Sequence, residues 1–285
     1  MPLVERMAVV GVGLIGASLA LAAKRSGLVG SVVGVGRGVG NLELARERGI
    51  IDDFTHDPAA AAQDADVLLL AVPVGALAAV VRAAAPALRP GTIVTDAGSV
   101  KGAVLGAIEA ELPAGVAFVG GHPIAGGEQA GAAHADVELF RDRLCILTPG
   151  PTSTAAARAC VRALWEGVGM RVIEMDADRH DEVLAQVSHV PHVLAYALMN
   201  AMDDTEALAF AGPSFRDLTR IAASPTEVWR DIFLANRHAL HRTLARVRRA
   251  IDDIDRALAD ADAEALTERI AAARERKRRL DDGDA

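Results

Sequence analysis

The stretch Gly11-Val12-Gly13-Leu14-Ile15-Gly16 follows a short apolar run and precedes an Ala-rich segment with the length of a helix. Glycines at this spacing, between a strand and a helix, are typical of the phosphate-binding turn of dinucleotide-binding domains. The first glycine permits the tight turn, the second lets the backbone approach a pyrophosphate, and the third lets the helix pack closely on the strand. The helix N-terminus at Leu14 and Ile15 then faces the phosphates. The stretch predicts a site for NAD or NADP, and the alternative is a close-packed glycine turn without a ligand.

Outward from this turn, short β-branched runs alternate with Ala-rich segments as far as Met175. Strands are expected at residues 7–10, 32–35, 67–72, 92–95, 116–119, 144–147 and 171–174, and helices at 14–26, 75–88, 101–111 and 153–168. Beyond Met175 only helical segments follow, at 177–202, 225–258 and 261–280. The alternation predicts an α/β fold, a Rossmann-type doubly wound sheet in residues 1–175. An all-helical domain is expected in residues 176–285.

Composition excludes several classes of partner. The chain has 285 residues, is 51% hydrophobic and carries a net charge of −8, which argues against nucleic acid as a partner. The sequence contains no run of about twenty uncharged apolar residues, so no membrane span is predicted. Cys145 and Cys160 have no CxxC spacing, which favours a reducing, cytoplasmic location. The segment from Arg6 to Ala23 superficially resembles a secretory signal, but the glycines that interrupt it favour the nucleotide turn.

The end of the second predicted strand bears on the choice of cofactor. An NAD-specific site normally carries Asp or Glu there, to bind the ribose hydroxyls. This chain reads Gly34-Val35-Gly36-Arg37 instead. Arg37 can reach a ribose 2′-phosphate or lie flat against adenine, which favours NADP or the use of both cofactors. The alternative is a surface arginine on a loop.

Further motifs stand at the carboxyl ends of predicted strands, where ligands bind in open α/β sheets. Val72, Pro73 and Asp96 are expected to contact the cofactor. Asp96-Ala97-Gly98-Ser99-Val100-Lys101 offers Ser99 as a ligand to substrate, or as a helix cap. Gly121-His122-Pro123-Ile124-Ala125-Gly126 holds a histidine between glycines and a proline, as a catalytic base is usually presented.

The helical half contributes Ser188-His189-Val190-Pro191-His192. Ser188 and His192 are four residues apart and share a helix face, and Pro191 is expected to kink or interrupt that helix. The histidines, with His180 upstream, have some likeness to metal ligands. No acidic or cysteine partner completes the set, so no metal site is predicted.

In this order, and followed by Phe215-Arg216-Asp217-Leu218-Thr219-Arg220-Ile221-Ala222 and Trp229-Arg230-Asp231, the motifs resemble the prephenate and arogenate dehydrogenase family of tyrosine biosynthesis. The resemblance runs from about residue 6 to about residue 240. It implies an NAD(P)-dependent oxidative decarboxylation of a cyclohexadienyl acid, in which prephenate gives 4-hydroxyphenylpyruvate. It also implies a helical domain that binds substrate and forms a homodimer. At 285 residues, the chain is not expected to hold a fused chorismate mutase domain.

The resemblance assigns roles to the remaining residues. His122 is expected to be the base at the ring hydroxyl, supported by Ser99. His192 and Ser188 are expected near the substrate, and Arg220 is expected to bind a substrate carboxylate, oriented by Asp217. Glu128 is placed at the entrance of the site.

Alternatives remain at this point. The same motifs fit arogenate, which is converted directly to tyrosine. The family's usual acid at the end of the second strand is missing, so the preference for NAD or NADP is open. More distant possibilities are another Rossmann hydroxyacid or imine oxidoreductase, or a dinucleotide sensor without catalysis.

Overall fold

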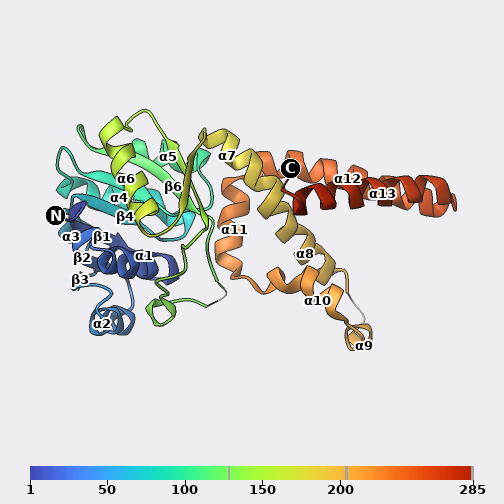
Figure 1. Ribbon diagram of the computed structural model, residues 1–285, viewed down its shortest axis with the longest axis horizontal. Helices are drawn as coiled ribbons and strands as arrows, with labels where there is room; N and C mark the ends of the chain where they lie inside the picture. Colours follow the sequence, from blue (N-terminus) through green and yellow to red (C-terminus); the bar gives the residue numbers. More distant parts are fainter. Residues whose placement is uncertain (128, 203–204, 284–285) are drawn as a thin grey trace. The chain divides into compact units, whose positions relative to one another are not determined.

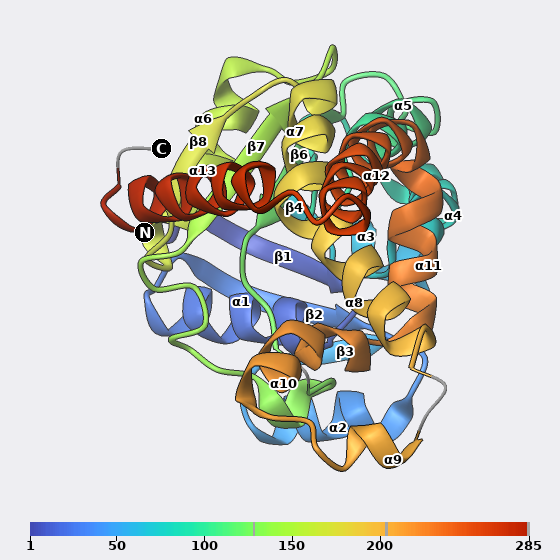
Figure 2. The same ribbon diagram turned by 90° about the vertical axis from the view of Figure 1, so that its right-hand side faces the viewer.

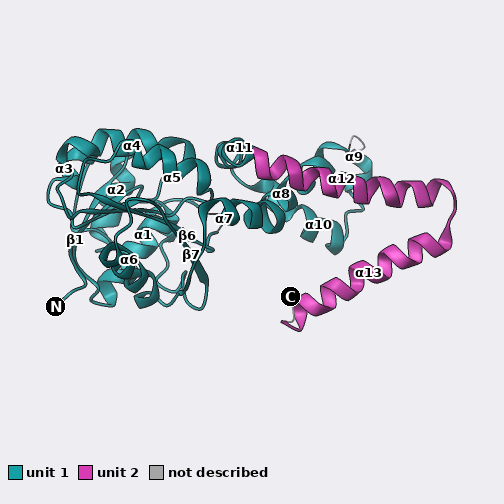
Figure 3. Ribbon diagram, turned by 90° about the horizontal axis from the view of Figure 1, so that it is seen from above, with its two compact units in different colours: residues 1–237 teal, residues 238–285 magenta. Residues whose placement is uncertain are grey.

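The structure, a computed structural model, describes residues 1–127, 129–202 and 205–283. The chain divides into two compact units, residues 1–237 and residues 238–285 (Figure 3). Unit 1 contains the whole sheet and helices α1 to α11. Unit 2 contains α13 (Ala263–Asp281) and all but the first residue of α12 (Arg237–Ala259).

In the described residues, unit 1 holds an eight-stranded sheet (Figure 1). Its strands are β1 (Val4–Val10), β2 (Val29–Val35), β3 (Asp53–Thr55), β4 (Val67–Leu70), β5 (Ile93–Asp96), β6 (Ala117–Pro123), β7 (Leu144–Pro149) and β8 (Arg171–Glu174). The order across the sheet is β3-β2-β1-β4-β5-β6-β7-β8. Neighbouring strands are parallel except β6 and β7, which run antiparallel. The predicted α/β class is confirmed.

Helices cover both faces of this sheet (Figure 3). They are α1 (Leu14–Arg25), α2 (Val39–Glu47), α3 (Pro58–Ala62), α4 (Leu77–Ala84), α5 (Gly102–Glu109) and α6 (Ala155–Gly167). The side chains of β1 alternate between two cores: Met7 and Val9 join the core with α1 and α6, whereas Ala8 and Val10 join the core with α4 and α5. This is the period-two alternation that a strand buried on both faces requires.

The chain reverses direction across the sheet between β1 and β4. From β1 it proceeds outward to β2 and β3, and it returns to form β4 on the other side of β1. The carboxyl ends of β1 and β4 therefore flank a topological switch point, which is where open α/β sheets bind their ligands. Gly11 follows β1, and Ala71 and Val72 follow β4.

The rest of unit 1 is helical. It comprises α7 (Ala177–Leu184), a π-helical turn (Ala185–His189), α8 (Val190–Asn200), α9 (Thr205–Leu208), α10 (Pro213–Thr219) and α11 (Thr226–Ala235). The segments α7 and α8 follow one another along one helical rod (Figure 1, Figure 2). The interruption expected from Pro191 is the π-helical turn, and Pro191 itself lies in the first turn of α8, where a missing N–H is tolerated.

Unit 2 consists of two long helices. Asp262 caps α13 by accepting a hydrogen bond from the Ala265 N–H at 3.0 Å, and Arg269 of α13 pairs with Asp253 of α12 at 3.3 Å. Among the described residues, no helix of either unit has both the length and the apolar character that a membrane crossing demands.

The structure also differs from the sequence prediction in detail. Strands β1 and β2 begin at Val4 and Val29, earlier than expected, and β6 continues through Pro123. The short edge strand β3 and the helices α2, α3 and α10 were not predicted. The domain boundary expected at residue 175 follows the end of β8 and stays a prediction.

Candidate active site

The glycine turn after β1 has the geometry that its three glycines predict. Gly11 has a φ of +97°, and a Cβ there would stand 2.3 Å from the Ala71 carbonyl oxygen. A Cβ at Gly16 would stand 2.2 Å from the Gly11 carbonyl oxygen, so this glycine lets α1 pack on the turn. A Cβ at Gly13 would meet no atom within 4 Å. Gly13 therefore borders open space at the N-terminus of α1, where Leu14 and Ile15 present amides without intrahelical acceptors.

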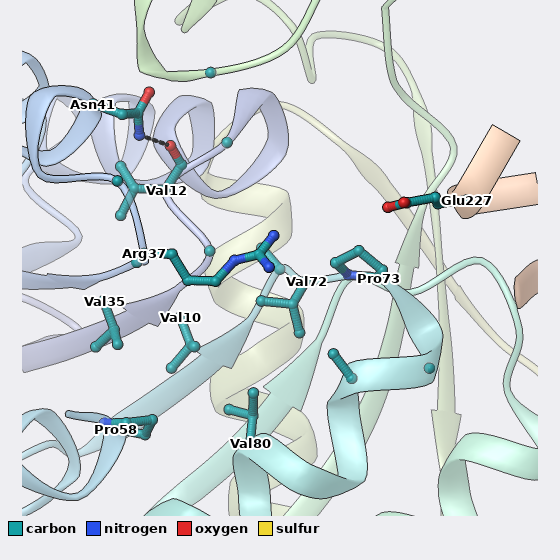
Figure 4. A pocket seen from close by; sticks show the side chains of 18 of the residues that line it. Val10, Val12, Val35, Arg37, Asn41, Pro58, Val72, Pro73, Val80 and Glu227 are labelled. Atoms are coloured by element: carbon teal, nitrogen blue, oxygen red, sulfur yellow. Dashed lines mark hydrogen bonds between the residues drawn. The ribbon is translucent and has the colours of Figure 1, made fainter. Parts of the chain in front are cut away.

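A cavity of about 900 Å³ opens beside this turn. It is lined by the glycine turn, the ends of β2 and β4, and one face of α11; the lining includes Gly11, Gly13, Arg37, Asn41, His56, Val72, Pro73, Glu227 and Arg230. The Arg37 guanidinium points into it above Val72, and Glu227 lies on the far side (Figure 4). Asn41 donates to the Val12 carbonyl at 2.8 Å and accepts from the Ala132 N–H at 2.8 Å, which ties the glycine turn to a later loop.

These residues fit a dinucleotide. Open space at a glycine amide and a free helix N-terminus suit a pyrophosphate, and the apolar side chains of Val72 and Pro73 suit a flat ring. The predicted cofactor residues Gly11, Gly13 and Arg37 line the cavity together.

Asp96 lies elsewhere, because its carboxylate is fully buried beneath the β5–α5 loop. It forms an ion pair with the buried Lys101 and accepts hydrogen bonds from the N–H groups of Gly98, at 2.8 Å, and Gly121, at 3.1 Å. Lys101 Nζ also donates to the Gly121 carbonyl at 2.8 Å. The pair thus joins the end of β5 to the residue before His122, and the structure does not place Asp96 at the cavity surface.

His122, the predicted base, is not among the residues that line the cavity. It stands near the carboxyl end of β6 and is 7% exposed. Its Nδ1 lies 2.8 Å from Nε2 of His180, and His180 Nδ1 lies 2.8 Å from Asp181 Oδ1. Burial lowers the pKa of His122 well below its ordinary value, and the neighbouring His180, Lys101 and His189 lower it further. His122 is therefore uncharged at neutral pH and able to accept a proton.

Ser99 is half-buried in the loop between β5 and α5. Helix α5 begins at Gly102 with Lys101 as its N-cap residue, and the amides of Lys101 and Gly102 donate to the Asp181 carboxylate rather than to Ser99. Ser99 is therefore not the helix cap that sequence left open as an alternative.

A second group of side chains lies on α8 and α11. The ring of His192 stacks on that of Trp229, with centroids 3.3 Å apart, and Nδ1 of His192 donates to the Ser188 carbonyl at 3.0 Å. Burial lowers the pKa of His192, and the charge of Arg220 lowers it further. Arg220 therefore lies close enough to act on the imidazole.

Buried His189 connects the two groups. Burial lowers its pKa to about 4, and both His180 and His192 contribute to the lowering. Its Nδ1 accepts from Asn236 Nδ2 at 3.1 Å, and the same amide donates to the Asp181 carbonyl oxygen at 2.8 Å.

The predicted carboxylate-binding residues lie at the surface. Arg220 and Asp217 are exposed and line a hollow of about 630 Å³ with Tyr196, between α8 and α10. Glu128 lies outside the described residues. Within residues 1–127, 129–202 and 205–283, no group of three or more His, Cys, Asp or Glu side chains is arranged to hold a metal ion.

Sequence reasoning missed three parts of this site. It gave no role to Lys101 or Asp181. It considered His180 only as a possible metal ligand, and it did not predict that Trp229 stacks on His192. The available signals were a lysine that directly follows a strand-end loop and a His-Asp pair at the start of a helix.

Together, a glycine turn at the switch point, an adjoining cavity and a buried neutral histidine define the class of Rossmann-type oxidoreductases with a helical second half. Family models match "prephenate dehydrogenase, nucleotide-binding domain" over residues 19–174 and "prephenate dehydrogenase, dimerization domain" over residues 176–272. The chain belongs to the prephenate dehydrogenase family.

Individual relatives agree with this assignment. The chain is 37% identical, over 94% of its length and 93% of the relative, to cyclohexadienyl dehydrogenase of Zymomonas mobilis subsp. mobilis. It matches the crystal structure of A. aeolicus prephenate dehydrogenase in complex with hydroxyphenyl propionate and NAD⁺, with a TM-score of 0.90, 31% identity and coverage of 97% and 98% of the two chains. For Synechocystis arogenate dehydrogenase the TM-score is 0.83, with 28% identity and coverage of 97% and 100%. The predicted family is confirmed.

Proposed function

We propose that this enzyme catalyses the NAD(P)-dependent oxidative decarboxylation of prephenate to 4-hydroxyphenylpyruvate, with arogenate as the alternative substrate. The observation that carries the proposal is the buried, neutral His122 at the strand-end edge of the sheet that also bears the glycine turn and its cavity. Similarity to proteins named for prephenate, arogenate and cyclohexadienyl substrates supports it.

The chemistry asks little of the protein beyond alignment and one proton acceptor. The bound dinucleotide supplies the hydride acceptor for ring C4. His122 takes the proton of the C4 hydroxyl as that carbon is oxidised, and half-buried Ser99 supports the same hydroxyl. Loss of the ring carboxylate as carbon dioxide then gives the aromatic product, and aromatisation drives the reaction.

The helical residues hold the substrate. Arg220 binds a carboxylate through its planar fork, and Asp217, one turn earlier, orients it. His192 and Ser188 border the same region, where the stack on Trp229 fixes the orientation of His192. Glu128 is proposed at the entrance by resemblance alone.

For the cofactor we propose NADP or dual use. Arg37 occupies the place at which NAD-specific sites carry an acid, and it points into the cavity (Figure 4). A guanidinium at this point can pair with a 2′-phosphate and stack on adenine.

We further propose that residues 1–175 bind the cofactor and that residues 176–285 bind substrate and form a cytoplasmic homodimer. The family model for a dimerization domain supports this division. On α12, Ile251, Ile254 and Leu258 are 52%, 45% and 60% exposed and share one helix face. Such a face suits a partner helix.

The test is reduced-nicotinamide absorbance with purified protein, with prephenate and arogenate each offered together with NAD and with NADP. Turnover in any pairing establishes the chemistry and ranks the substrates and cofactors. If folded, cofactor-binding protein turned over none of the four pairs, the proposal would be wrong.

A further inference from the structure

We propose that His180 and Asp181 are positioning residues that hold His122 in one tautomer, with Nδ1 protonated and Nε2 open to the substrate. The inference rests on the proposed function for its catalytic meaning. For its geometry it rests on three contacts that lead from the start of α5 through Asp181 and His180 on α7 to His122 on β6.

The chain begins at the Asp181 carboxylate. Its Oδ1 accepts from the Lys101 N–H at 2.8 Å, and its Oδ2 accepts from the Gly102 N–H at 2.9 Å. These amides belong to the start of α5, where the helix dipole also favours negative charge. Both oxygens of this carboxylate therefore act as hydrogen-bond acceptors.

The hydrogen-bond network then assigns the protons in sequence. His180 Nδ1 lies 2.8 Å from Asp181 Oδ1, so this nitrogen carries the proton and donates. In a neutral imidazole the other nitrogen is then an acceptor. His180 Nε2 therefore accepts from His122 Nδ1, 2.8 Å away, and this leaves His122 Nε2 without a proton.

The opposite assignment fails on electrostatic grounds. If His122 Nδ1 were the acceptor, His180 Nε2 would be the donor and a neutral His180 would turn a bare Nδ1 lone pair toward the Asp181 carboxylate. Two acceptors at 2.8 Å in a buried place repel one another. His180 is fully buried, so water does not relieve that repulsion.

For catalysis, this arrangement keeps the unprotonated Nε2 of His122 directed toward the substrate, ready to accept a proton. As the O–H bond of the C4 hydroxyl breaks, its proton forms a new N–H bond at His122 Nε2, and the hydride leaves C4 for the bound dinucleotide. The imidazolium keeps its Nδ1–H bond to His180, and the Asp181 charge beyond stabilises it. Loss of carbon dioxide leaves a phenolate oxygen on the ring, and the return of the proton from Nε2 to that oxygen gives the phenol and restores the starting tautomer.

Several titratable groups surround His122 and set its pH response. They are Asp96 at the end of β5, Lys101 in the loop that follows, Cys145 on β7, His180 and Asp181 on α7, and His189 at the end of the π-helical turn. Of these, His180, Lys101 and His189 lower the pKa of His122. Burial lowers the pKa of His180 as well as that of His122. Both rings are therefore neutral near pH 7, as the assignment requires.

The first experiment reads the tautomer directly, in protein with ¹⁵N-labelled histidine and no substrate. We expect the His122 ring to show a protonated Nδ1 and an unprotonated Nε2 by NMR. In Asp181→Asn the amide can donate to His180, and we expect the His122 tautomer to reverse or become mixed. Asp178→Asn is the matched control, because Asp178 is an exposed carboxylate on the same helix, and we expect no change there.

A wild-type His122 protonated on Nε2 would overturn the assignment, and so would an unchanged tautomer in folded Asp181→Asn protein. Because this experiment needs no turnover, it separates the assignment from the proposed function. If no cyclohexadienyl acid is turned over while the tautomer is as assigned, the proposed function fails and the hydrogen-bond chain stands.

The second experiment uses kinetics and does not depend on whether Asp181→Asn folds. His180→Gln keeps an oxygen that can accept from His122 Nδ1, whereas His180→Leu removes the acceptor. We expect kcat to fall about 10²- to 10⁴-fold in His180→Leu, with cofactor affinity unchanged, and to recover at least tenfold in His180→Gln. Equal kcat values in the two variants, or a loss confined to KM, would show that His180 only fills space.

Discussion

Replacement of Lys101 by methionine tests the buried support beneath the catalytic histidine. The Lys101 and Asp96 side chains are 1% and 0% exposed. The lysine ammonium pairs with the carboxylate and also donates to the Gly121 carbonyl at 2.8 Å. Methionine has a similar length without charge, so the substitution removes the cation and leaves the carboxylate in place.

The magnitude follows from what remains around Asp96. Removal of one partner of a buried ion pair costs about 3 to 5 kcal/mol, because the other charge is left uncompensated. Asp96 keeps the N–H donors of Gly98 and Gly121, at 2.8 and 3.1 Å. We therefore expect the lower part of that range, about 3 kcal/mol of unfolding free energy. We also expect a fall in kcat, since the Gly121 carbonyl precedes His122.

Urea denaturation measures the loss. The control is Arg82→Ala, because the Arg82–Glu111 pair lies at the surface, with side chains 66% and 24% exposed, and we expect a much smaller loss there. Lys101→Met combined with Asp96→Leu should regain most of the stability. If Lys101→Met cost no more than Arg82→Ala, the pair would not act as a buried support.

Three further predictions address the cofactor, the substrate and pH. Gly13→Ala should fold normally and show a lower dinucleotide affinity by calorimetry, because a Cβ at Gly13 would meet no atom within 4 Å. Gly16→Ala should lower the unfolding midpoint, because a Cβ at Gly16 would stand 2.2 Å from the Gly11 carbonyl oxygen. Equal effects of the two substitutions would contradict these roles. Arg220→Ala should raise KM about 30-fold, from a charged hydrogen bond worth about 2 kcal/mol, with little change in kcat; an unchanged KM would place the carboxylate elsewhere. Acid should destabilise the fold, because the pKa of buried His189 falls from 6.5 to about 4 on folding. As the pH falls, the unfolded chain binds a proton at His189 before the folded chain does. The contribution of His189 to the unfolding free energy is therefore full above pH 6.5, and about 3 kcal/mol of it is lost as the pH falls toward 4. A urea midpoint that stayed constant over that range would refute this prediction.

The sequence predicted the parts of the fold that local pattern determines. Val67 to Leu70 is a short apolar run that forms a fully buried strand, and the glycines at positions 11, 13 and 16 have one structural use each. Strand β3 was not predicted, because it has only three residues, begins with Asp53 and lies at the edge of the sheet. The antiparallel direction of β7 was not predicted, because the alternation of apolar residues does not indicate in which direction a strand runs in the sheet.

The part of the site that the sequence did not predict depends on contacts between residues that are far apart in the chain. His180 meets His122 across 58 positions, and Asp181 meets Lys101 across 80. A lysine in a sequence is ordinarily read as exposed, so Lys101 gave no hint that it is buried beside Asp96. Such pairs become visible only once β5, β6 and α7 are placed in space.

Replacement of His122 by asparagine shows whether this histidine is the catalytic base. Steady-state turnover of the preferred substrate, with cofactor affinity measured alongside by calorimetry, separates chemistry from binding. We predict that kcat falls at least about 10²-fold while the dissociation constant of the dinucleotide changes little. Turnover at the wild-type rate in His122→Asn would contradict the account and remove His122 from the reaction.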